Sequence, residues 1–455
     1  MHANIIRQDG RLLLKDLSCD CPLTHQTPEM DIYIRPGLVN ECGACIREAG
    51  LPDRVLIVAD SITLEVAART IKANLEKDGF VCKLCVLPGD KIEPTPQMAE
   101  YIIGHITPGT ELLLSVGSGV ITDRTRRSAY LSGIPFAAFG TAASMDGYTS
   151  VTSSMMVDGT KLTIYGCAAR LLMFDTDILA AAPKLMTAAG LGDMLAKYNV
   201  LVDWKLGSVI NGETYCPLCA HLLKTALDRC LDAIDDILAS TREGQEALIE
   251  ALILAGLTVL IVGNTRTVSS VEHNMSHYWE MRSLAYGTPS PSHGISVGIG
   301  LIYSLLYHKM LREADLSAID KEAVKAARMN KEQKWAYLVE NYPPGVPDEI
   351  KSVNEDWYIS WEEQERRIDA LTAYHDSYKK DCAILPDYRD IIRYLEHFGA
   401  PTSATKAGID RDTLKKTLTA TAFFRKRYSI SMALSELGLL DALADRIINE
   451  FEDNL

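Results

Sequence analysis

Positive charge is in short supply in this sequence. Its 46 lysines and arginines face 60 aspartates and glutamates, and the formal net charge at pH 7 is -14. A field of that sign repels a nucleic-acid backbone and an anionic membrane surface. We therefore expect no nucleic-acid partner, and an anionic substrate would have to be bound by donors placed locally in its site.

Long apolar runs are missing as well. The run LILAGLTVLIVG, from Leu252 to Gly263, is too short to cross a bilayer and predicts a buried helix. The N-terminal MHANIIRQDGR lacks the basic-then-apolar pattern of a secretory signal, and no low-complexity tract argues for disorder. These absences predict a folded protein of the cytoplasm with no membrane span.

A disulfide framework is not expected either, because eleven cysteines are an odd count spread over 455 residues with no secretory signal. Three CxxC pairs are present, and small apolar packing is favoured for each: Cys42 and Cys45, Cys82 and Cys85, Cys216 and Cys219. In CDCPLTH, Cys19, Cys21 and His25 are a better candidate for a second metal. They supply three ligands at unusual spacing, however, where a structural zinc takes four, so the pattern leaves this question open.

What the sequence does have is a change of periodicity along a chain long enough for two domains. From about residue 31 to 175, short β-branched runs alternate with helical patterns, which predicts a mostly parallel sheet covered by helices. After about residue 179 the pattern is helical only. We therefore expect an α/β, Rossmann-like dinucleotide-binding domain over residues 1–179 and an all-α domain over residues 180–455.

The expected strands are DIYIRPG, RVLIVAD, FVCKLCVLPG, ELLLSVG and IPFAAFG, and the expected helices between them are SITLEVAARTIKANLEKDG, TPQMAEYIIGHI and TDRTRRSAYLSG. The later segment SVTSSMMVDGTKLTIYG predicts a hairpin with Asp158 and Gly159 at its turn.

Small and polar residues follow several of the expected strands. In SVGSGVITD, Gly117, Ser118 and Gly119 stand between a strand and a helix, where backbone N–H groups can bind a phosphate. The GxGxxG fingerprint is incomplete because Thr122 replaces its third glycine, so a plain tight turn is an equal alternative. Asp60 ends another strand, where it could bind a ribose or cap the next helix. Because ligands bind beyond the carboxyl ends of such strands, Gly117, Thr141, Ser144 and Asp146 are expected to face one crevice.

Three of the ten histidines lie within a short stretch of the helical half. His273 and His277 are four residues apart and share a helix face, and His293 follows TPSPS, a turn that can bring the chain back. Asp193 begins another helix of the same half. One Asp and two His with an open fourth position make a competent catalytic divalent-metal site, although surface or packed histidines remain an alternative.

At these residues the chain resembles the bacterial sn-glycerol-1-phosphate dehydrogenases, within the iron-containing alcohol dehydrogenase-like superfamily that also holds glycerol dehydrogenase and 3-dehydroquinate synthase. The blocks GSGVITD, GIPFAAFGTAASMDGYTS, GLGDMLAKYNVLVDW and VEHNMSHYWEM, with the later SHG, carry the resemblance. It implies an active site in the cleft between the two domains. It also implies NADH- or NADPH-linked reduction of dihydroxyacetone phosphate to sn-glycerol 1-phosphate with zinc or nickel.

Carried over by position, the resemblance implies three groups of site residues. The metal ligands are Asp193, His273 and His293, and the substrate-contacting, catalytic residues are His277 and Asp146. The cofactor-binding residues are Asp60, Gly117, Ser118, Gly119, Val120, Ile121, Thr141, Ala142, Ala143, Ser144 and Ser150.

Some positions depart from the family pattern. NTRTVSSVEH lacks a glycine expected shortly before the ligand histidine, and Val120 and Thr122 stand where Thr and Asn are usual. These changes leave the ligands untouched and leave the choice between NADH and NADPH open. Arg266 and Lys197 are candidates for binding the substrate phosphate because they lie near the ligand segments, with surface charge as the alternative. A homo-oligomer is expected, since the apolar helices could bury a dimer face as well as a domain core.

Three other functions fit parts of this pattern. A dehydrogenase for an unphosphorylated polyol such as glycerol, or a lyase of the dehydroquinate-synthase type, would use the same fold. A cysteine-rich metal-binding or redox module would account for the CxxC pairs instead.

Overall fold

The chain folds into two compact units. The computed structural model describes residues 2–26, 29–89, 95–157, 160–355 and 357–455. The first unit contains Met1–Met194 and Cys216–Asn264, and the second contains Leu195–Tyr215 and Thr265–Leu455. The chain therefore leaves the first unit, returns to it and leaves it again.

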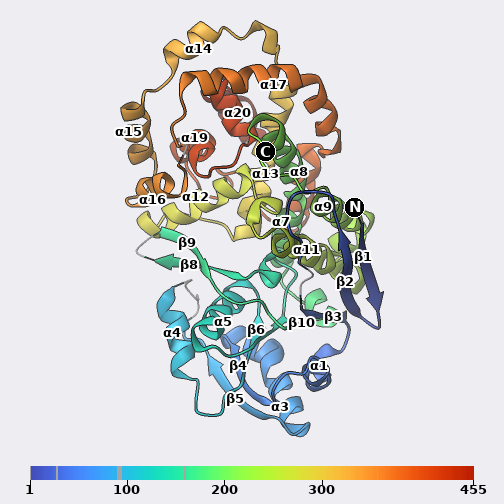
Figure 1. Ribbon diagram of the computed structural model, residues 1–455. Helices are drawn as coiled ribbons and strands as arrows, with labels where there is room; N and C mark the ends of the chain where they lie inside the picture. The colour runs from blue at the N-terminus through green and yellow to red at the C-terminus, as the bar shows by residue number, and fades with distance from the viewer. Residues whose placement is uncertain (1, 27–28, 90–94, 158–159, 356) are drawn as a thin grey trace. The chain divides into compact units, whose positions relative to one another are not determined.

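An eight-stranded sheet forms the centre of the first unit (Figure 1). Its strands are β1 (His2–Gln8), β2 (Arg11–Ser18), β3 (Asp31–Arg35), β4 (Arg54–Ala59), β5 (Val81–Val86), β6 (Leu112–Gly117), β7 (Phe136–Gly140) and β10 (Leu171–Asp175). Their order is β1-β2-β3-β10-β7-β6-β4-β5. Neighbours from β3 to β5 in this order pair in parallel, whereas β1 and β2 join as an antiparallel extension.

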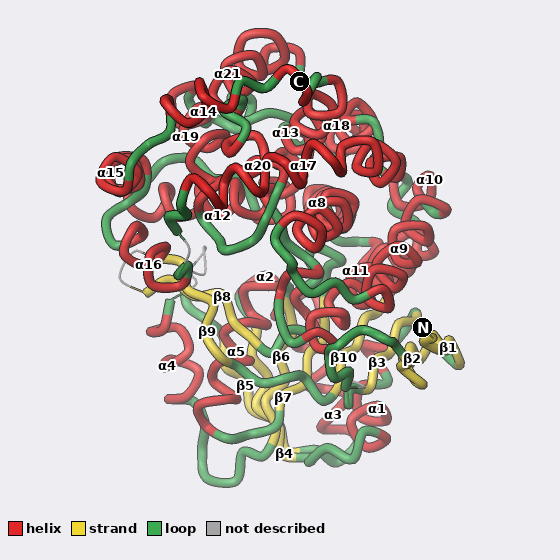
Figure 2. Tube along the Cα trace, turned by 45° about the horizontal axis from the view of Figure 1, so that its top comes forward, coloured by secondary structure: helices red, strands yellow, loops and turns green. Residues whose placement is uncertain are grey.

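Helices cover the parallel part of this sheet, which lies between them in Figure 2. On one face, α1 (Cys42–Glu48) and α3 (Arg69–Lys77) pack on strand side chains such as Ile57 and Leu114. In the other helical layer, α4 (Pro96–Gly104) packs on α5 (Gly119–Ser132), and α5 contacts β6 and β7. Strands β6 and β7 are buried along their whole length, as a parallel sheet under helices requires. The expected α/β fold is confirmed.

Three strands of the sheet lie outside the expected set. β1 and β2 form a hairpin whose turn residues, Asp9 and Gly10, have φ of 53° and 73°, the conformation that a two-residue type I′ turn needs. β10 enters the sheet between β3 and β7. The expected hairpin further along is confirmed as β8 (Thr152–Val157) and β9 (Thr160–Tyr165), which pair antiparallel, while its turn at Asp158 and Gly159 lies outside the described residues.

Several helices after the last strand also belong to the first unit. They are α6 (Thr176–Ala180), most of α7 (Lys184–Leu195), α9 (Pro217–Asp232), α10 (Ile234–Leu238) and α11 (Arg242–Val262). The expected division between residues 179 and 180 differs from this grouping. The end of the strand pattern marks where helices begin, but it does not tell which helices pack on the sheet, and α11 contacts both β3 and α6.

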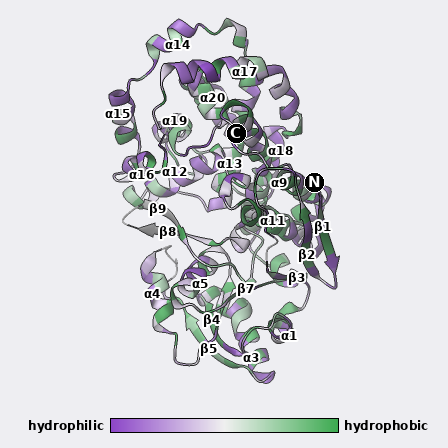
Figure 3. Ribbon diagram, in the orientation of Figure 1, coloured by the Kyte–Doolittle hydropathy of each residue, from purple (hydrophilic) through white to green (hydrophobic). Residues whose placement is uncertain are grey.

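The described part of the second unit is built from helices. They are α8 (Lys197–Ile210), α12 (Val271–Tyr286), α13 (His293–Glu313), α14 (Lys321–Ala327), α15 (Lys331–Asn341), α16 (Val346–Val353), α17 (Trp361–Asp381), α18 (Tyr388–His397), α19 (Arg411–Ala420), α20 (Ile430–Glu436) and α21 (Leu440–Arg446). α13 is almost wholly buried and packs against α12, α18 and α20. α17, by contrast, is rich in charged residues and largely purple in Figure 3.

Two helices, α11 and α13, are long and apolar enough to cross a membrane by length and composition alone. Their most apolar windows are 78% and 94% buried inside the protein. Both are therefore core helices here, and the buried helix expected at Leu252–Gly263 is confirmed.

Candidate functional site

The carboxyl ends of β4, β6 and β7 meet at one edge of the sheet. β4 pairs with β6 and β6 with β7, all in parallel, and the amide of Thr141 donates to Gly117 O at 3.3 Å. From β4 the chain moves outward to β5 and then returns to β6, so the strand order reverses between β4 and β6. Open α/β sheets bind ligands at such a switch point. The segments expected to share a crevice therefore begin at neighbouring strand ends.

The turn after β6 is built for close approach of backbone groups. Ser118 is the N-cap of α5, so the first N–H groups of this helix are free of intrahelical bonds. A Cβ on Gly117 would lie 2.4 Å from Ile121 Cδ1, and one on Gly119 would lie 2.7 Å from Met145 Sδ. Any larger residue at either position would have to displace the side chain of Ile121 or Met145. The turn combines a helix N-terminus with glycines that carry no side chain over the backbone N–H groups, as a phosphate-binding site does.

Asp60 follows β4 and caps the short helix α2 (Ser61–Thr63). Its carboxylate accepts from Thr63 N at 2.7 Å and from Thr63 Oγ1 at 2.8 Å, while Asp60 N donates to Thr63 Oγ1 at 3.1 Å. This is a reciprocal capping box. The capping alternative is therefore present in the structure, at the switch-point edge where a ribose would also be bound.

The segment after β7 is held by a buried arginine. Arg126, on α5, donates from Nη2 to Gly147 O and Tyr148 O at 2.9 Å each, and from Nη1 to Thr152 O at 3.1 Å. Tyr148 returns toward the strand and donates to Ala142 O at 2.9 Å. Burial lowers the pKa of Arg126, but Asp123 pairs with it and offsets part of that effect. TDRTRRSAYLSG indicated only a helix, so this anchoring role was not predicted.

Helices α7 and α11 pack closely against the backbone of the segment after β7. A Cβ on Gly190 of α7 would lie 1.9 Å from Ala143 O, and one on Gly256 of α11 would lie 2.3 Å from Asp146 O. Asp193, one turn after Gly190, is fully buried and accepts from Asp146 N at 3.0 Å. The first unit thus brings together the expected metal ligand Asp193 and the expected substrate residue Asp146.

The second unit brings the three histidines together. His273 and His277 lie on α12 and His293 begins α13. Their ring centroids are 5.5 Å apart for His273 and His293, 5.6 Å for His277 and His293, and 6.3 Å for His273 and His277. The turn TPSPS therefore does return the chain to α12, as the sequence predicted.

Glu280 joins this cluster and was not predicted. Ligand atoms of His277, Glu280 and His293 lie within 4.8 Å of one another. His293 Nδ1 lies 2.9 Å from Glu280 Oε1 and 3.2 Å from Ser276 Oγ. Glu280 follows His277 by three residues in HYWEM, a spacing that shares a helix face and could have identified it.

A chain of buried hydrogen bonds orients His273. Its Nδ1 lies 2.7 Å from Glu272 Oε1, and Asn199 Nδ2 donates to the other oxygen of Glu272. Asn199 Oδ1 in turn accepts from His308 Nε2 at 2.7 Å, and Tyr378 lies 2.7 Å from His308 Nδ1. Burial lowers the pKa of His308 to about 3, so this ring is neutral and accepts from Tyr378.

The carboxylate in this chain is charged despite its burial. Burial is the largest single influence on Glu272 and acts to raise its pKa. The hydrogen bond and charge of His273 and the backbone N–H groups of Ser270 and Glu272 together outweigh burial, and the pKa lies below its ordinary value. A charged Glu272 accepts a hydrogen bond from Nδ1 of His273 and so favours the tautomer that carries its lone pair on Nε2. Carboxylates support metal-binding histidines in this way.

Arg266 and Lys197 are both buried and bonded within the second unit. Arg266 donates to Glu213 at 2.7 Å, to Asp203 O at 2.8 Å and to Tyr428 O at 2.9 Å. Lys197 Nζ donates to Val268 O at 3.0 Å. Arg266 thus has a structural role that its place in the sequence did not reveal.

Comparison with known proteins identifies the family. The profile of the iron-containing alcohol dehydrogenases matches residues 33–183. The glycerol-1-phosphate dehydrogenase [NAD(P)+] of Halalkalibacterium halodurans is 38% identical over 301 residues, which are 65% of this chain and 75% of that protein. The Bacillus licheniformis protein of the same name is 29% identical over 94% of both chains.

Solved structures agree at the level of the fold. Glycerol dehydrogenase from Schizosaccharomyces pombe aligns over 94% of this chain and 92% of its own, with a TM-score of 0.59 and 16% identity. Maleylacetate reductase from Agrobacterium tumefaciens aligns over 91% and 97%, with a TM-score of 0.58 and 13% identity. At such identities the comparison shows the fold alone. The relatives found by sequence establish the family: the chain belongs to the glycerol-1-phosphate dehydrogenases of the iron-containing alcohol dehydrogenase family.

Proposed function

We propose that this protein reduces dihydroxyacetone phosphate to sn-glycerol 1-phosphate, reversibly, with NADH or NADPH and a divalent metal. The names of its relatives support this activity. The observation that carries the proposal is the cluster of His273, His277 and His293, with Glu272 and Glu280 bonded to two of its rings. Such a cluster is typical of a metal-assisted site rather than of a packed core.

The metal ligands we propose are Asp193, His273 and His293. Two imidazoles and one carboxylate suit zinc or nickel and leave a position for the substrate. The fit is supported by the hydrogen bond at Nδ1 of His273, because it favours the tautomer whose lone pair, the metal-binding pair, is on Nε2. The bond from Asp146 N to Asp193 similarly fixes that carboxylate.

The cofactor residues we propose all belong to the first unit. They are Asp60, the Gly117–Ile121 turn, the Thr141–Ser144 segment and Ser150. Their support is the meeting of three parallel strand ends at a switch point, with a helix N-terminus for the pyrophosphate. When bound, the cofactor supplies the hydride and the metal polarises the C2 carbonyl.

His277 and Asp146 are the residues we expect to contact the substrate. An imidazole titrates near neutral pH, so His277 can donate a proton to the oxygen on C2 as the carbonyl is reduced. Stacking of its ring on His293, at 20° between planes, restricts its orientation. Asp146, held by its own backbone bond to Asp193, can accept from a substrate hydroxyl.

We also place the enzyme in the cytoplasm, as a homo-oligomer that supplies a glycerol phosphate for lipid synthesis. The acidic net charge and the buried state of α11 and α13 support a role away from the membrane core. Light scattering after size-exclusion chromatography would give the oligomeric state.

The deciding experiment follows NADH and NADPH oxidation with metal-stripped protein resupplied with zinc or nickel. Dihydroxyacetone phosphate and dihydroxyacetone are compared as substrates, and the product's stereochemistry is determined enzymatically. We expect metal-dependent formation of the sn-1 isomer from the phosphorylated substrate only. His293→Ala should abolish turnover, whereas His221→Ala, an exposed histidine on α9, should retain it.

Preference for the unphosphorylated substrate would make the protein a polyol dehydrogenase. Cofactor binding without net oxidation would indicate lyase chemistry. Full turnover by metal-free protein would contradict the proposed metal role.

A further inference from the structure

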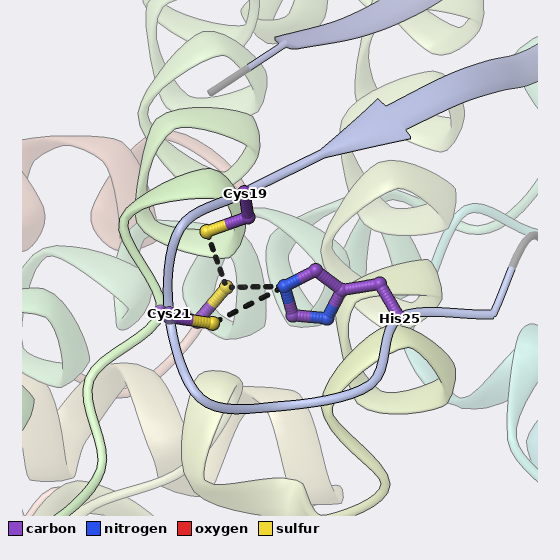
Figure 4. Close-up of side chains that lie close together, drawn as sticks. Cys19, Cys21 and His25 are labelled. Carbon is purple, nitrogen blue, oxygen red and sulfur yellow. Dashed lines mark hydrogen bonds between the residues drawn. The ribbon is translucent and has the colours of Figure 1, made fainter.

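A second group of metal-binding side chains lies in the first unit. Cys19 and Cys21 follow β2, and His25 lies in the same loop, and these three side chains point toward one another in Figure 4. Cys216, the N-cap of α9, joins them from far along the chain. One ligand atom from each of the four residues lies within 4.8 Å of all the others. The three-ligand pattern seen in CDCPLTH therefore becomes a four-ligand set.

The distances between the ligand atoms are close to those around one tetrahedral ion, and only the Cys21–His25 distance is clearly shorter. Cys21 Sγ lies 3.2 Å from His25 Nε2, Cys216 Sγ lies 3.5 Å from the same nitrogen, and Cys19 Sγ lies 3.9 Å from Cys216 Sγ. Tetrahedral zinc with ordinary bond lengths separates two sulfurs by about 3.8 Å and a sulfur from a nitrogen by about 3.6 Å. A disulfide, by contrast, needs sulfurs about 2.05 Å apart and would use only two of the three thiols.

The surrounding groups orient the ligands toward a common point. His25 Nδ1 lies 3.4 Å from Ile261 O on α11, so it carries the proton and leaves the Nε2 lone pair facing the sulfurs. Cys219 N donates to Cys216 Sγ at 3.4 Å. That bond, at the N-terminus of a 16-residue helix, favours the thiolate form of Cys216.

We propose that Cys19, Cys21, His25 and Cys216 bind a structural zinc ion. A closed set of three thiolates and one imidazole leaves no position for a substrate, which distinguishes it from a catalytic site. This proposal replaces the packing role expected for Cys216, because its sulfur lies close to two cysteines and a histidine.

The ion would tie the segment after the N-terminal hairpin to α9. The same hairpin also contacts α9 and α11, and Arg7 of β1 forms an ion pair with Glu250 of α11. Since these elements are more than 190 residues apart in sequence, cross-linking them would restrict the unfolded chain strongly. The inference goes beyond the proposed reaction and does not depend on it.

The first test measures zinc in protein purified without chelators, in the His293→Ala background so that the proposed catalytic ion is reduced. We expect one zinc per chain there, lost in Cys19→Ser and Cys216→Ser. Cys82→Ser, which replaces a half-buried cysteine outside the cluster, should retain it. His25→Cys should keep the ion as a four-cysteine site, whereas His25→Ala should lose it.

A second measurement does not depend on the folding of any cysteine variant. The zinc X-ray absorption spectrum of the His293→Ala protein should show three sulfurs at about 2.3 Å and one nitrogen at about 2.0 Å. Replacement by cobalt should give thiolate-to-metal charge-transfer absorption. A spectrum without sulfur ligands, zinc content unaffected by Cys19→Ser and Cys216→Ser, or a disulfide among these cysteines in protein purified under reducing conditions would each overturn the proposal. None of these results bears on the reduction of dihydroxyacetone phosphate, which is measured separately.

Discussion

At the scale of single residues, the chemistry of the histidine cluster depends on partners that face away from it. Glu272 accepts a hydrogen bond from Nδ1 of His273, and Asn199 Nδ2 donates to the other carboxylate oxygen. Neither partner would contact a metal or substrate in the proposed site. Their effect is on which nitrogen of His273 is available and how basic it is.

Glu272→Gln should therefore weaken metal binding about 10- to 100-fold, as loss of a carboxylate behind a ligand histidine generally does. Chelator competition would measure the affinity. Glu436→Gln is the control, since Glu436 is also buried in the second unit but is bonded to Arg367 and Tyr428. Equal metal affinity in the Glu272→Gln protein and the control would contradict the assigned tautomer.

Arg266 gives a second prediction at this scale. Replacement by alanine leaves the partly buried carboxylate of Glu213 without its guanidinium partner, although Tyr428 N still donates to it. Breaking a fully buried pair in this way costs about 3–5 kcal/mol of unfolding free energy, and we expect a smaller loss here. We expect a lower thermal midpoint with little change in KM for dihydroxyacetone phosphate. An unchanged midpoint with a raised KM would instead restore Arg266 as a phosphate-binding residue.

Asp203 and His308 carry opposite pH dependences. Burial raises the pKa of Asp203 to about 7 and lowers that of His308 to about 3. Folded Asp203 therefore holds a proton that the unfolded chain releases above about pH 4, so its contribution to stability is lost as pH rises toward 7. His308 stays neutral in the folded protein down to about pH 3, whereas in the unfolded chain it binds a proton below about pH 6.5. Its contribution to stability is therefore lost as pH falls from about 6.5 toward 3.

Asp203→Asn should remove the contribution of Asp203 and retain that of His308. Relative to pH 7.5, the unfolding free energy of this variant should be about 1.4 kcal/mol lower at pH 5.5. The unaltered protein should show a smaller loss or a gain over the same range, because Asp203 acts in the opposite direction. Urea unfolding at the two pH values measures both, and identical changes in the two proteins would refute the assignment.

At the scale of elements, α7 and α11 define the position of the segment after β7. Gly190 and Gly256 let these helices approach its backbone more closely than any side chain would permit. Gly190→Ala or Gly256→Ala should lower the unfolding free energy by about 1–3 kcal/mol through overpacking and should reduce turnover. Gly104→Ala, where a Cβ would meet nothing within 4 Å, should stabilise α4 by about 0.4–1 kcal/mol instead. Circular dichroism melts and initial rates would compare the three variants.

The sequence predicted most of these elements because their signals are local. The strands β3 to β7, the hairpin of β8 and β9, and the buried α11 follow from short runs of residue type. β1 and β2 could also have been found, since Asp9 and Gly10 are a hairpin signal between two short apolar runs. LLMFD, the sequence of β10, is a short apolar run, which periodicity alone cannot assign to a strand.

The unpredicted site residues share a different cause. Arg126, Gly256 and Cys216 contact segments that are distant in sequence. The residues next to each of them do not indicate which segment that is. Glu280 is the exception, because its spacing from His277 already placed both on one face. Local patterns thus predicted the histidine cluster but not the side chains that support it.

At the scale of the whole molecule, the proposed cofactor-binding and catalytic residues belong to different units. All cofactor residues lie in the first unit, together with Asp193, whereas the three histidines lie in the second. The double variant His273→Ala, His293→Ala should therefore bind NADH with an affinity within about threefold of the unaltered protein while losing turnover. Fluorescence titration with NADH would measure this. A joint loss of both would show that cofactor binding depends on the histidine cluster.

The discontinuous path of the chain has a consequence for synthesis on the ribosome. Every residue of the first unit has been made once Asn264 has been added, and that unit can then fold as a whole. The segment Leu195–Tyr215, which contains the apolar α8, has been made by then, but its packing partners follow only after Thr265. At ordinary elongation rates, roughly ten to forty seconds pass between the synthesis of α8 and the synthesis of the rest of the second unit. During translation, α8 is therefore the segment for which we expect protection by chaperones to matter most.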